Sequence, residues 1–213
     1  MKFRDRESMV VLGSFLGVTA LVAASVLALV SIYTAEPISK AQENNRQKVF
    51  HRLLLPPFDS TAESIMVDGC TFTPVLNSGK LAGFVGQGNS RGGYGGEIEA
   101  LVGFDLNGRI TAVQILRHKE TPGLGANVCD RKFQRTVFNL REAAPEVPEN
   151  KFLDQYNFRD SRSAGSWRIA KDGGEFDYLT GATVTSRAVT ELVDRISSVF
   201  AKSGLINAGE MKR

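Results

Sequence analysis

Hydroxyl side chains crowd one short segment of the chain, DYLTGATVTSRAV, which holds three threonines and a serine within seven residues. Thr185 falls in the first turn of a predicted helix, where unpaired backbone N–H groups and the positive end of the helix dipole favour an anion. Gly181 and Ala182 leave room for a large group to approach. The pattern has two interpretations. Thr180 or Thr183 caps the helix by accepting a backbone N–H, or a phosphate is bound or attached at Thr185.

A second segment of interest is HKETPGLG, which directly follows a predicted strand. Its Pro122-Gly123 pair fits a tight turn, and a turn needs only two or three of these residues. The flanking Glu120, Thr121 and Gly125 bring a carboxylate, a hydroxyl and accessible backbone amides to the end of a sheet. Alone, this segment indicates either an ordinary turn or a loop that contacts a ligand.

The glycine-rich stretch GFVGQGNSRGGYGGE does not match a nucleotide-binding motif. Arg91 occupies the position of the third glycine in G-x-G-x-x-G, and no Gly-Lys-Ser/Thr ending of a P-loop is present. GNSRG formally matches G-x-S-x-G around Ser90, but the glycines that follow do not predict the helix that a nucleophile elbow requires. We therefore predict a flexible loop over residues 83–96 that lies near a ligand.

Composition excludes several classes of function. The chain has 213 residues and a net charge of +3, with its basic residues scattered among acidic ones. Because no Lys/Arg cluster is interleaved with aromatic residues, nucleic-acid binding is not predicted. Two cysteines and two histidines, without a CxxC or a Cys/His cluster, exclude an iron–sulfur cluster or a closed zinc site held by this chain alone. Cys70 and Cys129 either pair or remain buried free thiols.

The N-terminal region predicts a membrane span. Residues Met9 to Ile32 carry no charged side chain. As a helix they would measure about 36 Å, enough to cross a hydrocarbon core of about 30 Å. A cleaved signal peptide is the alternative, but its apolar core normally runs about 7–15 residues. Basic residues are more frequent before the span than directly after it, which favours a cytoplasmic tail and an external domain.

The rest of the chain predicts an α+β domain with an antiparallel sheet and flanking helices. Apolar residues alternate over 97–104 and 109–118, two predicted strands that flank DLNG, and strands are also predicted over 71–75 and 81–85. Helices are predicted over 130–140 and from 189 to 200, the second ending at Ser203-Gly204. The expected organisation is a tail (1–8), a transmembrane helix (9–33), a linker helix (34–58), the folded domain (59–204) and a C-terminal tail (205–213).

Three separated motifs together resemble the FMN-binding domain family. DYLTGATVT matches the flavinylation motif D-x-x-[ST]-G-A-[ST]-x-[ST] at every specified position. ETPGLG and the hairpin GGYGGEIEALVGFDLNGRITAVQILRH also look like segments of this family, and all three occur in the expected order. The chain, with one span ahead of the domain, is most similar to the G subunits of Rnf (Rsx) electron-transport complexes. The C subunit of the sodium-translocating NADH:quinone reductase is a near relative and the alternative.

The resemblance implies a covalent flavin carrier. In this family the last threonine of the motif, here Thr185, carries FMN through a phosphoester that a separate flavin transferase makes from FAD with Mg²⁺. The resemblance assigns two further groups of residues. The recognition segment comprises Asp177, Thr180, Gly181, Ala182 and Thr183, and the flavin is lined by Glu120, Thr121, Gly123, Leu124 and Gly125.

The implied setting is the bacterial inner membrane, with the domain on the periplasmic side and other membrane subunits of the complex as partners. The electron donor and acceptor centres would lie in those subunits, so the chain would catalyse no complete reaction alone. A membrane-tethered scaffold, in which the hydroxyl-rich segment only caps a helix, is the non-redox alternative.

Overall fold

The computed structural model describes residues 2–53, 59–131 and 148–206, with side chains described over 11–37, 59–131 and 148–206. The chain divides into two units, Met1–Gln47 and Lys48–Arg213. Helix α1 (Lys2–Leu53) contains Pro37 and continues through the boundary that we expected between residues 33 and 34. The predicted stop at Pro56-Pro57 lies outside the described residues.

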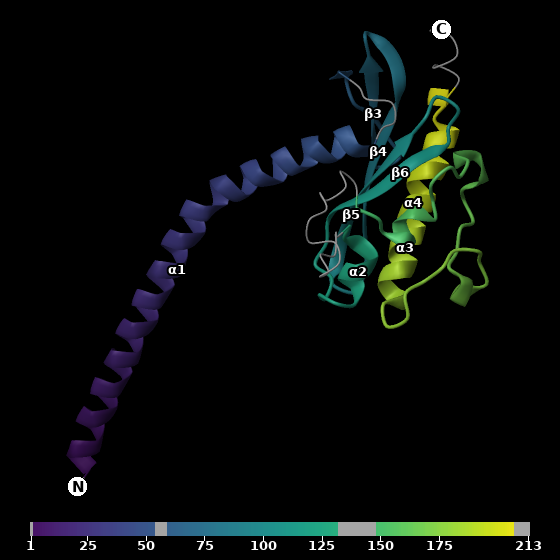
Figure 1. Ribbon diagram of the computed structural model, residues 1–213. Helices are drawn as coiled ribbons and strands as arrows, with labels where there is room; N and C mark the ends of the chain where they lie inside the picture. Colours follow the sequence, from purple (N-terminus) through teal and green to yellow (C-terminus); the bar gives the residue numbers. More distant parts are fainter. Residues whose placement is uncertain (1, 54–58, 132–147, 207–213) are drawn as a thin grey trace, which may run out of the picture. The chain divides into compact units, whose positions relative to one another are not determined.

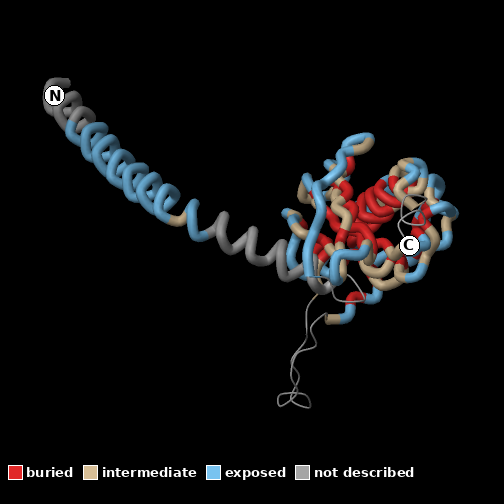
Figure 2. The backbone as a smooth tube through the Cα atoms, turned by 90° about the horizontal axis from the view of Figure 1, so that it is seen from above, coloured by how far each residue is buried: buried red, intermediate tan, exposed pale blue. Residues whose placement is uncertain are grey.

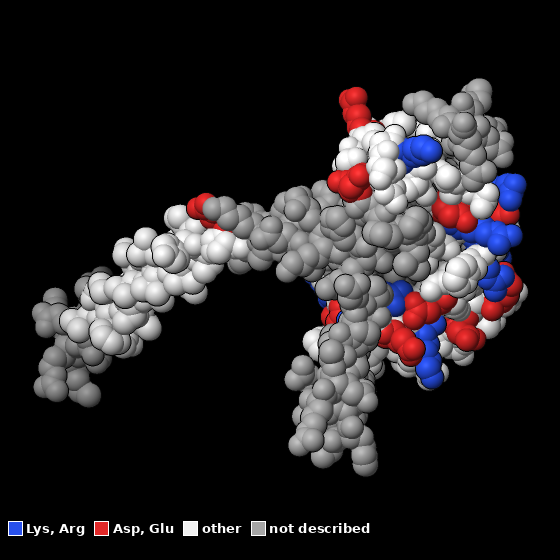
Figure 3. Space-filling view, turned by 45° about the horizontal axis from the view of Figure 1, so that its top comes forward, with Lys and Arg blue, Asp and Glu red and all other residues white. Residues whose placement is uncertain are grey.

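The first unit contains an apolar helical segment. Residues Val11–Pro37 of α1 are long and apolar enough to cross a membrane, and none of the most apolar part is buried by the rest of the chain. Its leucines and valines are 54% to 70% exposed, and Glu36 is its one charged residue, so this part of Figure 3 is almost uniformly white. A helix that is apolar on all sides is stable inside a protein or in lipid. Because this chain does not cover it, the helix fits a membrane anchor.

The second unit is built on a six-stranded sheet with all strands antiparallel to their neighbours (Figure 1). The central strands are long, and two short strands pair with β3 on the side away from β4. The sheet order is β1-β3-β4-β5-β6, with β2 also paired to β3. The strands are β1 (Ser60–Thr61), β2 (Ile65–Val67), β3 (Cys70–Asn77), β4 (Lys80–Gly93), β5 (Gly96–Phe104) and β6 (Ile110–Arg117).

Local turn chemistry sets the strand order. The β3–β4 turn has positive φ at both central residues, Ser78 (52°) and Gly79 (75°), which is the conformation of the two-residue turns that match strand twist. In the β5–β6 turn, Asp105 Oδ1 accepts the backbone N–H groups of Asn107 (2.9 Å) and Arg109 (2.8 Å). These side-chain contacts replace backbone bonds that the turn cannot make.

Helix α4 (Thr183–Lys202) packs on the sheet, and the main buried core lies between them. Its predicted apolar stripe is buried, from Val189 to Phe200, and Figure 2 shows buried residues concentrated along this helix and the strands. The Phe200 ring stacks on Phe104 of β5 with centroids 4.2 Å apart. Alternate residues of β5, Ile98, Ala100, Val102 and Phe104, point into the same cluster, which confirms the predicted period of two.

The prediction of a flexible loop over residues 83–96 is wrong, because most of this stretch is strand β4. Glycine is required there by close packing instead of by flexibility. A Cβ atom on Gly86 would lie 2.8 Å from Ile196 Cγ2 and 2.8 Å from Phe72 Cε1, and one on Gly88 would lie 2.9 Å from Ile196 Cγ1. The missing side chains allow α4 to approach β4.

We expect Gly86→Ala to lower the free energy of unfolding by about 1–3 kcal/mol, because the added methyl group overfills a packed contact. Urea denaturation of the detergent-solubilised chain can be followed by the fluorescence of Trp167, which is the sole tryptophan and is buried. Gly92→Ala is the matched control, since its Cβ would meet only ordinary contacts at 3.4 Å or more. Equal midpoints for the two variants would contradict the packing explanation.

Short helices connect β6 to α4. They are α2 (Gly125–Cys129), α3 (Lys151–Asp154) and the 3₁₀ helices η1 (Ser161–Ser163) and η2 (Ala170–Asp172). Asn150 caps α3 by accepting the N–H groups of Phe152 and Leu153, and its amide donates to the carbonyl groups of Val128 and Asp130 near α2. Of the helix predicted over 130–140, the first two residues are not helical and the remainder lies outside the described residues.

The two cysteines are free and buried, so they do not form a disulfide. Burial raises the pKa of the Cys70 thiol, and burial together with the nearby Glu120 carboxylate raises the pKa of Cys129 to about 12. Both thiols therefore remain protonated at neutral pH and act as small apolar side chains. Of the two alternatives, buried free thiols are confirmed.

Candidate functional site

An open pocket of about 660 Å³ lies at the N-terminal end of α4. Its walls come from the β4–β5 turn, the loop after β6, η2 and the segment that leads into α4. The residues that line it are Tyr94, Glu120, Thr121, Leu124, Gly125, Lys171, Gly181, Ala182, Thr183, Val184 and Thr185. Two segments separated by more than fifty residues in the sequence therefore meet at one site, and both were singled out in the sequence.

Helix α4 begins at Thr183 without a side-chain cap, and its N-cap residue is Ala182. The predicted capping role of Thr180 or Thr183 is therefore wrong. A turn through Gly181, with φ of 86° and a hydrogen bond from Ala182 N to Leu179 O (2.9 Å), puts alanine at the cap position. No side chain therefore caps the backbone N–H groups in the first turn of α4.

Ser186 fixes the start of the helix instead. Its Oγ accepts the backbone N–H of Leu179 (3.1 Å) and donates to the carbonyl of Ala182 (3.0 Å). This residue is fully buried, whereas Thr180 is exposed. The serine that follows the motif therefore holds the turn, which leaves the hydroxyl of Thr185 for another contact.

Thr185 contacts Glu120 from the loop after β6. Thr185 Oγ1 donates a hydrogen bond to Glu120 Oε2 at 2.7 Å. The second carboxylate oxygen, Oε1, accepts the backbone N–H of Gly95 at 3.0 Å. Thr185 is 1% exposed and Glu120 is 6% exposed. A buried carboxylate thus joins the start of α4, the loop after β6 and the β4–β5 turn.

The loop that carries Glu120 has a defined conformation. Thr121 O accepts the backbone N–H groups of Leu124 and Ala126, both at 3.2 Å, and Gly123 has φ of 80°. Proline followed by glycine with positive φ is typical of a type II turn. His118 links this loop to the end of α2. Its Nδ1 accepts the Glu120 N–H (3.2 Å), and its Nε2 lies 2.7 Å from Asp130 Oδ1.

Lys171 brings positive charge to the pocket. It is the one lysine or arginine among the described residues that line the pocket, and its Nζ lies 6.0 Å from the centre of the Tyr178 ring. Its neighbour Asp172 accepts two hydrogen bonds from Arg187 of α4, at 2.6 and 2.8 Å. This hydrogen-bonded pair lowers the pKa of Asp172. The pair holds η2 against α4.

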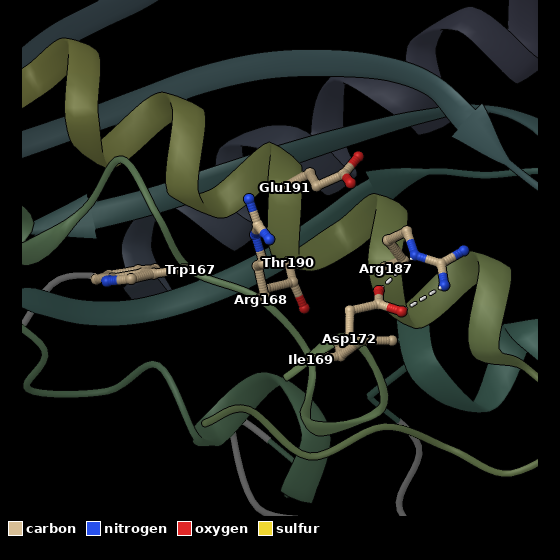
Figure 4. A pocket seen from close by; sticks show the side chains of 7 residues that line it. All are labelled: Trp167, Arg168, Ile169, Asp172, Arg187, Thr190 and Glu191. Atoms are coloured by element: carbon tan, nitrogen blue, oxygen red, sulfur yellow. Dashed lines mark hydrogen bonds and ion pairs between the residues drawn. The ribbon is translucent and has the colours of Figure 1, made fainter. Parts of the chain in front are cut away.

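Figure 4 shows this contact in a second, smaller pocket of about 290 Å³, where Arg187 reaches down from α4 to the carboxylate of Asp172. Trp167, Arg168 and Thr190 also contribute side chains to it. Asp172 and Arg187 bind each other in this second pocket. We infer that their contact supports the segment that carries Lys171.

The structure brings most of the predicted site residues together. Eight of them line the larger pocket: Glu120, Thr121, Leu124, Gly125, Gly181, Ala182, Thr183 and Thr185. Three do not line it: Asp177, Thr180 and Gly123. The backbone N–H of Asp177 donates to Gln155 Oε1 at 2.7 Å. The hydroxyl groups of Thr180 and Thr183 make no hydrogen bond with another described residue. Tyr94 also lines the pocket and lies within residues 83–96, the stretch predicted to lie near a ligand, whereas sequence reasoning missed Lys171 and Val184.

Three features of the pocket fit a flavin that carries a phosphate. The uncapped first turn of α4 suits an anion, and Lys171 adds a positive charge. Apolar and aromatic side chains at the opening are accessible, with Leu124 49%, Val184 44% and Tyr94 76% exposed. Flat aromatic ligands bind against such surfaces. Among the described residues, no cluster of three or more His, Cys, Asp or Glu side chains is placed to hold a metal ion.

Comparison with known proteins agrees with this geometry. The family described as FMN-binding domain matches residues 93–198, which include the β4–β5 turn, the loop after β6 and most of α4. The G subunit of an ion-translocating oxidoreductase complex from Pseudomonas aeruginosa (strain UCBPP-PA14) is 33% identical over 94% of this chain and 92% of its own length.

The G subunits of the same kind of complex from two other bacteria are also similar. That of Shewanella loihica is 27% identical over 92% of this chain and 91% of its own length. That of Vibrio parahaemolyticus is 40% identical over 47% of this chain and 41% of its own length. The similarity to the Pseudomonas and Shewanella proteins extends over nearly the whole of each protein, beyond the flavin-binding region alone. The chain therefore belongs to the family of G subunits of the ion-translocating oxidoreductase complex, and it contains that family's FMN-binding domain.

Proposed function

We propose that this protein is a membrane-anchored electron carrier that holds FMN covalently through Thr185 and works as a subunit of an Rnf-type ion-translocating oxidoreductase. The observation that carries the proposal is the position of Thr185. It lies in the uncapped first turn of α4, on the wall of a pocket large enough for a flavin, and within a complete flavinylation motif.

The charges of the pocket support a phosphate at this position. A phosphodiester carries one negative charge, and the helix N-terminus and Lys171 both favour it. The carboxylate of Glu120 opposes it, and the positive charge of Lys171 in the same pocket offsets this repulsion. Covalent attachment also prevents dissociation of the cofactor, which suits a compartment without a supply of free flavin. FMN, when bound, supplies the electron-accepting chemistry, and the chain binds, orients and shields it.

Helix α1 and the relatives support the proposed membrane setting. The apolar segment Val11–Pro37 is the proposed single membrane span, with the basic tail in the cytoplasm and the domain in the periplasm. Other subunits of the complex, which the names of the relatives imply, are the proposed electron-transfer partners. A flavin transferase is the proposed maturation enzyme. The relatives that match over nearly their full length are named as G subunits, which favours the Rnf-type assignment over the quinone-reductase alternative and over a non-redox scaffold.

Mass spectrometry of the denatured chain tests the proposal. We expect the protein purified from its native membrane to be heavier than the sequence by one FMN minus one water, since only a covalent flavin survives unfolding. Peptide mapping should assign the added mass to the peptide that contains Thr185. An unmodified chain from flavin-replete cells that contain an active flavin transferase would overturn covalent attachment.

A further inference from the structure

The Thr185 hydroxyl is held by a potential base. Thr185 Oγ1 and Glu120 Oε2 are 2.7 Å apart, although 65 positions separate the two residues in the sequence. An alcohol is a weak nucleophile until a neighbouring base accepts its proton. The distance lies within the hydrogen-bond range that a general base requires. Because the hydrogen bond uses the hydroxyl proton, the lone pairs of Oγ1 remain available for bond formation.

Glycine residues leave room for the Glu120 carboxylate on both sides. A Cβ atom on Gly93 would lie 2.6 Å from Glu120 Oε1, and a Cβ atom on Gly125 would lie 2.3 Å from Oε2. Each oxygen therefore faces a glycine that no other residue type can replace without a shift. Gly95 N–H holds Oε1 at 3.0 Å, which fixes the rotation of the carboxylate and directs Oε2 at Thr185.

We propose that Glu120 orients the Thr185 hydroxyl and accepts its proton when the flavin phosphoester forms, an inference that rests on the function proposed above. Thr185 Oγ1 forms a bond to the flavin-side phosphorus of the FAD pyrophosphate. The bond from that phosphorus to the bridging oxygen breaks, and AMP leaves with this oxygen. The proton passes from Oγ1 to Glu120 Oε2 and then to water. The chain thus supplies the base for its own modification, while the transferase supplies FAD and Mg²⁺.

A purely structural role for Glu120 makes a different prediction. Glutamine has nearly the same shape, but its amide has one acceptor oxygen, so it can satisfy only one of the two donors that Glu120 receives. If Glu120 only joined the segments, Glu120→Gln would lower stability and leave the rate of flavin attachment to the folded chain unchanged. If Glu120 accepts the proton, the rate falls while the final extent of attachment is unchanged.

The experiment measures that rate directly. The full chain is produced without flavin in cells that lack the flavin transferase and is purified in detergent. It is then mixed with purified transferase, FAD and Mg²⁺, and covalent flavin is followed by intact mass. Wild type, Glu120→Gln, Glu120→Asp and Thr185→Val are compared, with Glu191→Gln as the matched control because this exposed glutamate of α4 does not line the larger pocket. Trp167 fluorescence gives the folded fraction in each sample.

We expect Glu120→Gln to be labelled at least about 100-fold more slowly than wild type and to reach the same final extent. Glu120→Asp, which keeps the carboxylate but withdraws it by one methylene, should fall between them, and Glu191→Gln should match wild type. A wild-type rate for folded Glu120→Gln would overturn the proposal. If Glu120→Gln does not fold, a wild-type rate for Glu120→Asp overturns it. Labelled Thr185→Val, or unlabelled wild type, would refute the proposed function itself.

Discussion

Thr185→Val should produce a folded, membrane-bound protein with no covalent flavin. Valine has the shape of threonine but lacks the oxygen through which the phosphoester forms. The substitution also leaves Glu120 Oε2 without the hydrogen bond that it receives at 2.7 Å, which should cost about 1–3 kcal/mol of stability. In-gel flavin fluorescence of denatured membrane protein is the measurement, and the band present in wild type should be absent.

Two further variants make the Thr185 result specific. Thr185→Ser keeps a hydroxyl at the same backbone position and should retain the fluorescent band. Thr71→Val removes a threonine hydroxyl from β3, outside the pocket lining, and should be labelled like wild type. Undiminished fluorescence in Thr185→Val would locate the covalent flavin on another residue. Loss of the band in Thr71→Val would point to a general folding defect.

Gly125→Ala should abolish most flavin attachment while the domain remains folded. The new Cβ would lie 2.3 Å from Glu120 Oε2 and 2.7 Å from Thr185 Oγ1. Both neighbours are the ends of side chains, so the fold can adjust by rotating them apart. That rotation breaks the hydrogen bond between Thr185 and Glu120. The Thr185 hydroxyl then loses the orientation that this bond gives it. We expect a stability loss of about 1–2 kcal/mol and flavin incorporation reduced at least about 100-fold.

Gly92→Ala separates the effect of site geometry from that of adding a methyl group. It adds the same group to the β4–β5 hairpin, where the contacts would be ordinary at 3.4 and 3.5 Å. Its flavin incorporation, measured by intact mass, and its urea midpoint should both match wild type. Normal incorporation in Gly125→Ala would show that attachment does not depend on the contact between Thr185 and Glu120.

The elements that follow from local periodicity were predicted well. The long apolar run predicted the helix that contains Val11–Pro37. The alternation of apolar and polar residues predicted β5 and β6 and their buried face. The stripe of the last helix gave α4 and its buried residues. These patterns depend on neighbouring residues within one element, and side-chain direction in a helix or strand is set by its period.

Contacts between distant segments could not be predicted in the same way. The sequence singled out Glu120 and Thr185 separately, but their hydrogen bond exists only because the sheet and α4 bring the two segments together. Lys171 lies in no recognisable pattern, and its position depends on the pair formed by Asp172 and Arg187.

Glycine composition was misleading for a related reason. A run of glycines usually indicates a flexible loop, because glycine has little conformational preference. In β4, Gly86 and Gly88 are extended residues whose missing side chains make room for Ile196 of α4. That requirement comes from the opposite element, so nothing within the stretch itself distinguishes it from a loop. Tyr94, near the end of this stretch, lines the pocket, so the prediction was wrong about the conformation of the stretch and not about its place beside the site.

The open side of the pocket, where Tyr94 and Leu124 remain accessible, has a kinetic consequence for a flavin bonded to Thr185. The phosphoester fixes only one end of the cofactor, and the ribityl chain is a short flexible tether. Such a tether keeps its free end at an effective concentration on the order of millimolar. A binding surface that holds the isoalloxazine ring with only millimolar affinity would therefore be occupied about half of the time. The ring could leave to meet a partner subunit and return without ever being lost.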